Sequence, residues 1–430
     1  MAELSDAPTA GSSRLPEIRV PGLLTLAGLI AGLVLGLLLT DAEILPPLLA
    51  IAGPVGTLWL QALKMTILPL VAGLLFTGIV ETAAAARAGA MARRTLGYIA
   101  GLLALSTLVG ALLMPLWLRL FPVPRGIAPA GAVEPQGAVP TLADFALSLI
   151  PNNVITAAAN DALLPVIVFV ALLAAATTRL AAPQRGLLTG FFEALMAAML
   201  VLIGWVLWLA PIGVFALGLT LAATSGAAAL GALAHYIVLV SSVGLVMLVL
   251  AYPVAVLLGR QPLGAFARAV FSAQVFALST QSSLASLPTM LGSCARLKLR
   301  ASTAEFVLPL AVTLFRVTSP GMNIAVCIYA AELAQVELTP TAIAAGALVA
   351  FITTFGTVSL PGTISFIAST APIAAAMGVP LWPLAVLVAV EMLPDIMRTV
   401  ANVTMDVAVT AAVDRGGMQE GHKSALGPQE

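Results

Sequence analysis

The sequence contains few charged residues, histidines or cysteines for its length. Charged side chains make up 9% of its 430 residues, against roughly 25% in an ordinary globular domain. A soluble protein of this size could not keep its surface hydrated with 19 basic and 19 acidic side chains. Two histidines and two cysteines provide neither a disulfide framework nor a histidine-based metal centre. The net charge of zero gives no indication of a nucleic-acid partner, and we expect none.

Apolar residues dominate the composition instead. They make up 60% of the chain, and the mean hydropathy is +1.08. Because a membrane-spanning helix needs about 20 apolar residues, these values predict an all-α polytopic protein in a lipid bilayer. The first apolar region lacks a small-residue cleavage site, so we interpret it as a retained helix after a tail over residues 1–20. The apolar regions before residue 259 lie at about 21–40, 54–81, 94–120, 141–178 (interrupted at Pro151), 186–220 and 228–258.

Basic residues between these regions indicate the orientation. Arg87, Arg93 and Arg94 follow the second region, and basic residues also follow the fourth and the sixth. Acidic or uncharged stretches follow the first and the fifth. Positive charge marks the cytoplasmic side of a membrane protein. We therefore expect a protein of the cytoplasmic (inner) membrane with cytoplasmic N- and C-terminal tails, the latter over residues 415–430.

Two later segments carry polar interruptions that lipid would not tolerate. Residues 260–300 have basic residues at both ends and the polar run from Ser279 to Pro288 between them. Residues 340–377 have no basic flank and a polar run over residues 353–363. Irregular backbone at membrane depth must be buried in protein or line a cavity, so we predict two re-entrant hairpins that enter from opposite sides. The alternative is a pair of ordinary spanning helices with proline kinks in each segment.

Each predicted hairpin precedes an apolar region that crosses the membrane, at about 301–331 and 381–413. The chain then has eight transmembrane helices and two oppositely oriented hairpins, and residues 259–414 form a transport core of inverted repeats. Inverted repeats with interrupted helices are typical of secondary transporters that bind substrate near the bilayer midplane.

The last apolar region carries polar side chains on one face. Glu391, Asp395, Arg398, Asn402 and Asp406 follow one another at steps of three or four residues, which keeps them within about 80° around a helix. Each charge inside a membrane costs about 2.5–3.5 kcal/mol and needs a partner or a wet cavity. A guanidinium suits a carboxylate and a carboxylate suits an ammonium group, so the stripe favours a zwitterion with an additional carboxylate. The alternative is a structural ion-pair ladder of Glu391 and Asp395 with Arg398.

The stripe, Asp395-Ile-Met-Arg398-Thr399-Val-Ala-Asn402-Val-Thr-Met-Asp406, resembles the last helix of the dicarboxylate/amino acid:cation symporters, the glutamate transporter family. Segments that begin at Leu63 and Pro151 are similar to the second and fourth helices of that family. Ser282-Ser283-Leu-Ala-Ser286-Leu287-Pro288 resembles its first hairpin, and Gly356-Thr357-Val-Ser-Leu-Pro361-Gly362 resembles its second. The resemblance covers nearly the whole chain.

This resemblance implies a homotrimer in which a substrate-carrying domain slides as an elevator against a rigid scaffold. Helices one, two, four and five would form the scaffold, and helices three and six would move with the core. Arg398 would hold the side-chain carboxylate of aspartate or glutamate, Asp395 the amino group, and Asn402 the α-carboxylate. The other substrate-binding residues that the resemblance implies are Ser282, Ser283, Ser319 and Thr399 in the pocket and Pro361 and Gly362 at the extracellular gate.

The cation-binding motif of the family is altered in this chain. The family's seventh helix carries Asn-Met-Asp-Gly-Thr, where this sequence reads Phe315-Arg316-Val317-Thr318-Ser319. Both oxygen ligands are lost, and hard cations need about six oxygens. Arg316 would supply a fixed positive charge beside Asp406, or would instead snorkel toward the cytoplasm. By the resemblance, one sodium site is partly kept, formed by Thr313, Thr354, Phe355 and Thr357.

We therefore expect a secondary active transporter of acidic amino acids, not an enzyme, with weak or no dependence on sodium. Coupling would use protons, with Glu391 or Asp406 as carriers, or the protein would exchange substrates. One sodium ion is the alternative coupling ion, and no other cofactor is expected. The rival functions are transport of C4-dicarboxylates, which Asp395 would repel, transport of neutral amino acids with conventional sodium coupling, and substrate binding without transport. A serine hydrolase is disfavoured because no His or Lys lies at either hairpin tip to act as general base.

Overall fold

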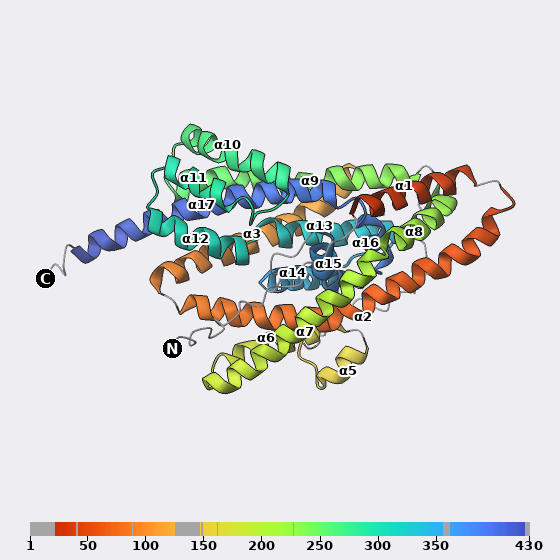
Figure 1. Cartoon of the computed structure of the whole chain (residues 1–430), viewed down its shortest axis with the longest axis horizontal. Coiled ribbons are helices and arrows are strands. Elements are labelled where there is room, and N and C mark those ends of the chain that lie inside the picture. The colour runs from red at the N-terminus through yellow and green to blue at the C-terminus, as the bar shows by residue number, and fades with distance from the viewer. Residues whose placement is uncertain are drawn as a thin grey trace, which may run out of the picture.

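The computed structural model describes residues 22–39, 42–87, 89–124, 147, 149–160, 162–226, 228–355 and 362–425. Every regular element in these ranges is a helix (Figure 1). Seven helical stretches, one of which joins the two helices over residues 301–333, are long and apolar enough to cross a membrane. The predicted all-α polytopic fold is confirmed. The elements are α1 (Gly22–Leu38), α2 (Leu45–Ala86), α3 (Ala90–Leu120), α5 (Val154–Ala159), α6 (Leu163–Thr177), α7 (Ala182–Trp208), α8 (Ala210–Ser225), α9 (Ala228–Pro253) with the π-helical turn η1 (Val254–Leu258), α10 (Leu263–Thr280), α11 (Leu287–Arg296), α12 (Ala301–Leu314), α13 (Thr318–Leu333), α14 (Pro340–Thr354), α15 (Gly362–Ala376), α16 (Trp382–Leu387) and α17 (Met392–Ala425).

The first helices pack closely through a row of glycines. α1 lies along α8, and α2 contacts α6, α7 and α8. Gly28, Gly32 and Gly36 recur every fourth residue and therefore share one face of α1. A Cβ atom added at any of the three would collide with the backbone of α8. The absence of a side chain at these positions is what allows α1 and α8 to approach.

The fifth predicted region is divided in the structure. α7 ends at Trp208 and α8 begins at Ala210, with Leu209 at the break. Pro211 follows directly and has no N–H to donate to the preceding turn, so the helix cannot continue unbroken. α1 has 17 residues and α6 has 15. These two of the predicted eight spans are too short to count among the seven long stretches, and the seventh stretch is α10 of the first predicted hairpin.

Both predicted hairpins are present as pairs of contacting helices. α10 contacts α11, and α14 contacts α15. α11 has 10 residues, and α14 and α15 have 15 each. These lengths correspond to about 15 Å and about 22 Å along a helix, which is less than the roughly 30 Å of a bilayer core. α10 is longer, at 18 residues or about 27 Å, and is one of the seven membrane-length stretches. The short α11, α14 and α15 favour the hairpins over four ordinary spanning helices.

The helix that follows each hairpin is interrupted. α12 ends at Leu314 and α13 begins at Thr318, with Arg316 in the break between them. α16 ends at Leu387 and α17 begins at Met392. Glu391 therefore lies in the turn before α17, which corrects the prediction that it belongs to one continuous helix with the rest of the stripe. Pro394 explains the break, because it lacks the N–H that would bond to the carbonyl of residue 390.

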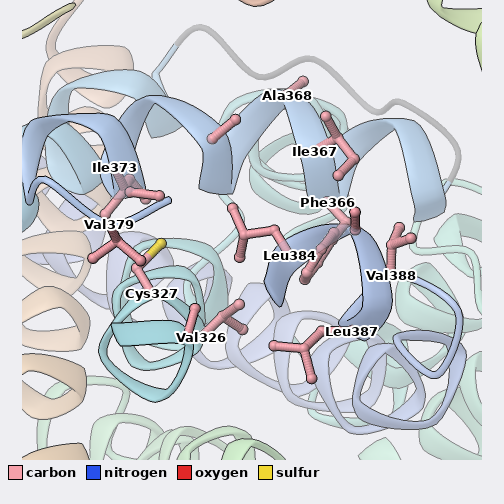
Figure 2. Close-up of a cluster of buried hydrophobic side chains, with 14 of the residues drawn as sticks. Val326, Cys327, Phe366, Ile367, Ala368, Ile373, Val379, Leu384, Leu387 and Val388 are labelled. Carbon is pink, nitrogen blue, oxygen red and sulfur yellow. The ribbon is translucent and has the colours of Figure 1, made fainter. Parts of the chain in front are cut away.

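A cluster of buried hydrophobic side chains packs next to the break before α17 (Figure 2). Phe366 of α15 packs in the same buried cluster as Leu384 and Leu387 of α16 and Cys327 of α13. α13, α15 and α16 contact one another. Because protein interiors are close-packed, this cluster fixes the end of α16 and, with it, the position of Glu391.

Candidate functional site

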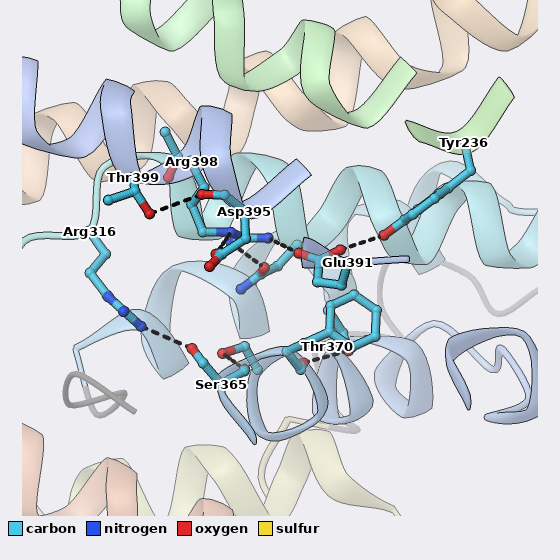
Figure 3. A network of polar contacts seen from close by, with 12 residues as sticks. Tyr236, Arg316, Ser365, Thr370, Glu391, Asp395, Arg398 and Thr399 are labelled. Atoms are coloured by element: carbon cyan, nitrogen blue, oxygen red, sulfur yellow. Dashed lines mark hydrogen bonds and ion pairs between the residues drawn. The ribbon is translucent and has the colours of Figure 1, made fainter. Parts of the chain in front are cut away.

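Arg398 lies inside the protein and is held by side chains from its own chain (Figure 3). Its Nη2 donates to Oε1 of Glu391 at 2.8 Å, and its Nη1 donates to Oδ1 of Asn323 at 2.9 Å. Its Nε lies 3.3 Å from Oδ1 of Asp395. Only 8% of Arg398 is exposed. A guanidinium is tolerated at this depth because each of its nitrogens has an acceptor.

Tyr236 holds Glu391 from the opposite side. The Tyr236 hydroxyl donates to Oε2 of Glu391 at 2.7 Å, and both residues are buried. Tyr236 belongs to α9, which packs along α17. Each carboxylate oxygen of Glu391 thus has one donor, a guanidinium on Oε1 and a phenol on Oε2. The ion pairs that we considered as a structural alternative are therefore formed.

Asp395 is the accessible member of this cluster. Its side chain is 20% exposed, against 9% for the side chain of Arg398. The hydroxyl of Thr399, which is buried, donates to the carbonyl oxygen of Asp395 at 2.9 Å. A ligand can therefore reach the Asp395 carboxylate with less rearrangement than the Arg398 guanidinium.

Asn402 ties α17 to the start of α13. Its Oδ1 accepts from the backbone N–H of Thr318 at 3.0 Å and from the Thr318 hydroxyl at 2.9 Å. Ser319, also buried, donates its backbone N–H to the carbonyl of Arg316 at 2.9 Å. With its carbonyl occupied, Asn402 can offer a ligand only its NH₂ group, and a carboxylate would accept from such a donor.

The remaining predicted pocket residues lie in the hairpins. Ser282 and Ser283 are half-buried in the link between α10 and α11, where the Ser282 hydroxyl accepts from the backbone N–H of Ala285 at 3.2 Å. Across the described ranges, no hydrogen bond joins either serine to α17. Gly362 begins α15, and Pro361 lies outside the described residues.

Arg316 and Asp406 do not form a direct ion pair. Nη1 of Arg316 donates to the hydroxyl of Ser365 on α15 at 2.9 Å (Figure 3). Asp406 is completely buried, and among the described residues neither of its carboxylate oxygens has a hydrogen-bond partner. Arg316 is therefore fixed by the second hairpin, a partner that the sequence analysis did not consider.

The residues of the predicted sodium site lie in different surroundings. Thr313 is exposed, and its hydroxyl donates to the carbonyls of Pro309 and Leu310 in its own helix. Thr354 is buried, Phe355 is half-buried, and Thr357 lies outside the described residues. Within the part of the chain that the structure describes, no three His, Cys, Asp or Glu side chains gather in a way that could hold a metal ion.

Two members of the site were not predicted from the sequence, Asn323 and Tyr236. Asn323 stands alone in an otherwise apolar and fully buried part of α13. Because a buried amide needs a hydrogen-bond partner, this isolation was a usable signal. Tyr236 gave a weaker one, since a tyrosine in an apolar helix is compatible with many partners.

Comparison of the sequence with known protein families identifies the family of this chain. The profile of the sodium:dicarboxylate symporter family matches residues 22–416, nearly the whole chain. The chain belongs to this family. Its relatives are named as symporters, so the expectation of a multi-pass transporter rather than an enzyme is confirmed.

Individual relatives of this symporter carry different names. The proton/sodium-glutamate symport protein of Bacillus subtilis is 27% identical over 389 residues, which cover 88% of each chain. The proton/glutamate-aspartate symporter of Escherichia coli is 24% identical over 385 residues, or 87% of each chain. The C4-dicarboxylate transport protein of Leptothrix cholodnii is 25% identical over 374 residues, or 84% of this chain and 82% of the relative. Membership of the family therefore leaves the choice between these substrates to the site.

Proposed function

We propose that this symporter carries acidic amino acids, aspartate and glutamate, by secondary active transport. The observation that supports this is the buried guanidinium of Arg398 beside the more exposed carboxylate of Asp395 on one face of α17. Arg398 would hold the side-chain carboxylate of the substrate through two parallel hydrogen bonds. Asp395 would pair with the ammonium group, and the NH₂ group of Asn402 would donate to the α-carboxylate. The names of the glutamate relatives agree with this assignment.

Transport of C4-dicarboxylates is the second candidate, because the Leptothrix relative bears that name. A dicarboxylate has no ammonium group, so the second carboxylate oxygen of Asp395, beyond the one that contacts Arg398, would face a dianion without a positive partner. Leaving a partly buried charge unpaired is costly. The partly exposed Asp395 carboxylate therefore favours an amino acid over a dicarboxylate as the substrate.

Coupling in this proposal depends weakly or not at all on sodium. Phe315 and Val317 bring no oxygen ligand where the family motif has Asn and Asp. Arg316 contributes a positive charge that is already attached to the chain and bonded to Ser365. Transport would then be driven by protons or by exchange, and one sodium ion at the Thr313–Thr354 site is the alternative.

We place the protein in the cytoplasmic membrane as a homotrimer with cytoplasmic termini. Two hairpins and two interrupted helices support an elevator in which residues 259–414 move with helices three and six. The separation of a scaffold from this core stays a prediction, as do the roles of Ser282, Ser283, Ser319, Thr399, Pro361 and Gly362.

Calorimetric titration of the purified protein in detergent tests the substrate class. We expect L-aspartate and L-glutamate to bind, succinate to bind more weakly and L-serine to bind least. Arg398→Ala should abolish binding of the acidic amino acids while the protein keeps its elution volume. Unchanged aspartate affinity in a folded Arg398→Ala protein would remove the assignment, and equal affinity for aspartate and succinate would favour a dicarboxylate carrier.

A further inference from the structure

Each nitrogen of the Arg398 guanidinium already contacts one acceptor on its own chain. Nη2 donates to Glu391, Nη1 donates to Asn323, and Nε contacts Asp395. A carboxylate ligand takes two parallel hydrogen bonds from two neighbouring nitrogens of an arginine. Both such pairs include Nη2, which already donates to Glu391. A substrate carboxylate on either pair therefore meets the like charge of Glu391 at Nη2.

Of the three partners of Arg398, Glu391 has the same functional group as the substrate side chain. It presents a carboxylate to Arg398, whereas Asn323 presents a neutral amide oxygen, and Asp395 is needed for the ammonium group. Glu391 also lies in the turn between α16 and α17 and not inside either helix, so its partner can change without unwinding a helix.

Displacement of Glu391 leaves a carboxylate in a poor environment. Glu391 is only 3% exposed, and without Arg398 it keeps one hydrogen bond, from Tyr236. An ionised carboxylate that loses its cation inside a protein is strongly disfavoured. Asp395 lies four residues further along the chain and adds a like charge. One proton on Glu391 removes both penalties.

We propose that Glu391 and the side-chain carboxylate of the substrate compete for Arg398, and that Glu391 takes up one proton from water when Arg398 changes partner. The inference rests on the proposed function. The step is balanced: the Arg398–Glu391 ion pair breaks, the Arg398–substrate ion pair forms, and the Glu391 carboxylate becomes a carboxylic acid. Release of the substrate reverses each change, so one proton accompanies each substrate. Tyr236 donates to Glu391 in both states and is a positioning residue.

The other groups around Glu391 do not lose a partner in this exchange. Asp395 keeps its contact with Arg398 and gains one with the substrate ammonium group. α15 and α16, which pack against the same region, contribute no titratable side chain. The remaining titratable or charged groups nearby are Tyr236 and His235 on α9, Cys327 and Tyr329 on α13, Arg398 on α17 and Arg316 in the break before α13.

Calorimetry of the intact wild-type protein gives the first test. Aspartate is titrated at a series of pH values and in buffers that differ in ionisation enthalpy, which gives the number of protons bound with the substrate. We expect one proton per aspartate, and a Kd that rises about tenfold for each unit of pH where Glu391 is ionised before binding. Binding without proton uptake at any pH would overturn the proposal.

Two variants assign the proton to Glu391. Glu391→Gln keeps the size and the hydrogen-bonding capacity of the side chain, and its Kd should be independent of pH and equal to the wild-type value at low pH. Tyr236→Phe removes only the phenol donor, so the wild-type slope should persist while the loss of affinity begins at higher pH. A wild-type slope in Glu391→Gln, or an unshifted profile in Tyr236→Phe, would contradict the inference.

The same variants separate this inference from the proposed function. If Arg398→Ala loses aspartate binding while Glu391→Gln keeps the wild-type pH dependence, the substrate assignment stands and the exchange at Glu391 is wrong. If Arg398→Ala binds aspartate normally, the proposed function itself is wrong. Should Glu391→Gln fail to fold, proton uptake by the wild-type protein and the profile of Tyr236→Phe still decide the question.

Discussion

Substitution of Arg398 by lysine keeps the positive charge and removes the planar fork. Arg398 contacts acceptors through three nitrogens at 2.8, 2.9 and 3.3 Å, and a lysine ammonium is a single point that cannot present two parallel N–H groups to one carboxylate. The substrate should therefore lose about one charge-assisted hydrogen bond, worth about 1.5–3 kcal/mol. That loss corresponds to a roughly 10- to 150-fold weaker Kd for aspartate in Arg398→Lys.

The assay is calorimetric titration of aspartate, with Tm measured on the same preparation. Arg398→Lys should also lower Tm, because the buried Oδ1 of Asn323 loses its donor. Arg300→Lys is the matched control: Arg300 donates to Oδ1 and to the backbone oxygen of Asp414, both at 2.7 Å, far along the chain from the site. It should lower Tm without changing aspartate affinity. An unchanged Kd in Arg398→Lys would show that the fork does not hold the substrate.

Three further predictions concern selectivity, coupling and packing. Aspartate should bind at least about tenfold more tightly than succinate, because succinate leaves the Asp395 charge unpaired, and titration of Asp395→Asn should show a smaller difference between the two ligands. Uptake of aspartate into proteoliposomes should persist when sodium is replaced by choline, and a steep sodium dependence would show that the lost ligands are replaced elsewhere. Gly32→Leu should lower Tm because a side chain there meets the backbone of α8, whereas Gly97→Leu, where a Cβ atom meets nothing within 4 Å, should leave Tm unchanged.

The helical architecture could be predicted from the sequence because few backbone structures are stable in a bilayer. A segment with basic residues at both ends and a polar centre, such as residues 260–300, cannot lie in lipid as one span. The contacting short helices α10 and α11 follow from that constraint. The stripe on α17 was accessible for a similar reason, since charges that recur on one helix face inside a membrane need a common environment.

The partners of Arg398 were not accessible in the same way. Asn323 precedes Arg398 by 75 positions, and Tyr236 precedes Glu391 by 155. Periodicity describes one helix at a time and does not say which helices meet. The break before α17 adds to the difficulty, because it moves Glu391 out of the helix on which the stripe was counted.

The partner of Arg316 was not predicted because a helix break sets the position of this residue. The sequence left two destinations for Arg316, a position beside Asp406 or the cytoplasm. The chain instead leaves the helix at Leu314, and Arg316 lies in non-helical backbone. Its guanidinium is therefore directed by the local turn and donates to Ser365 of the second hairpin.

The fixed charge at Arg316 bears on how transport is coupled. A sodium ion that neutralises buried carboxylates arrives and leaves with each cycle, so a gradient of that ion can drive transport. Arg316 also carries a positive charge but remains covalently attached in every state. It can stabilise the site without transferring energy from a gradient. In our proposal the coupling must therefore come from a group whose occupancy changes with the substrate, and the exchange of Arg398 between Glu391 and the substrate carboxylate provides one. Loss of the sodium ligands and proton uptake at Glu391 are, on this argument, two parts of the same change.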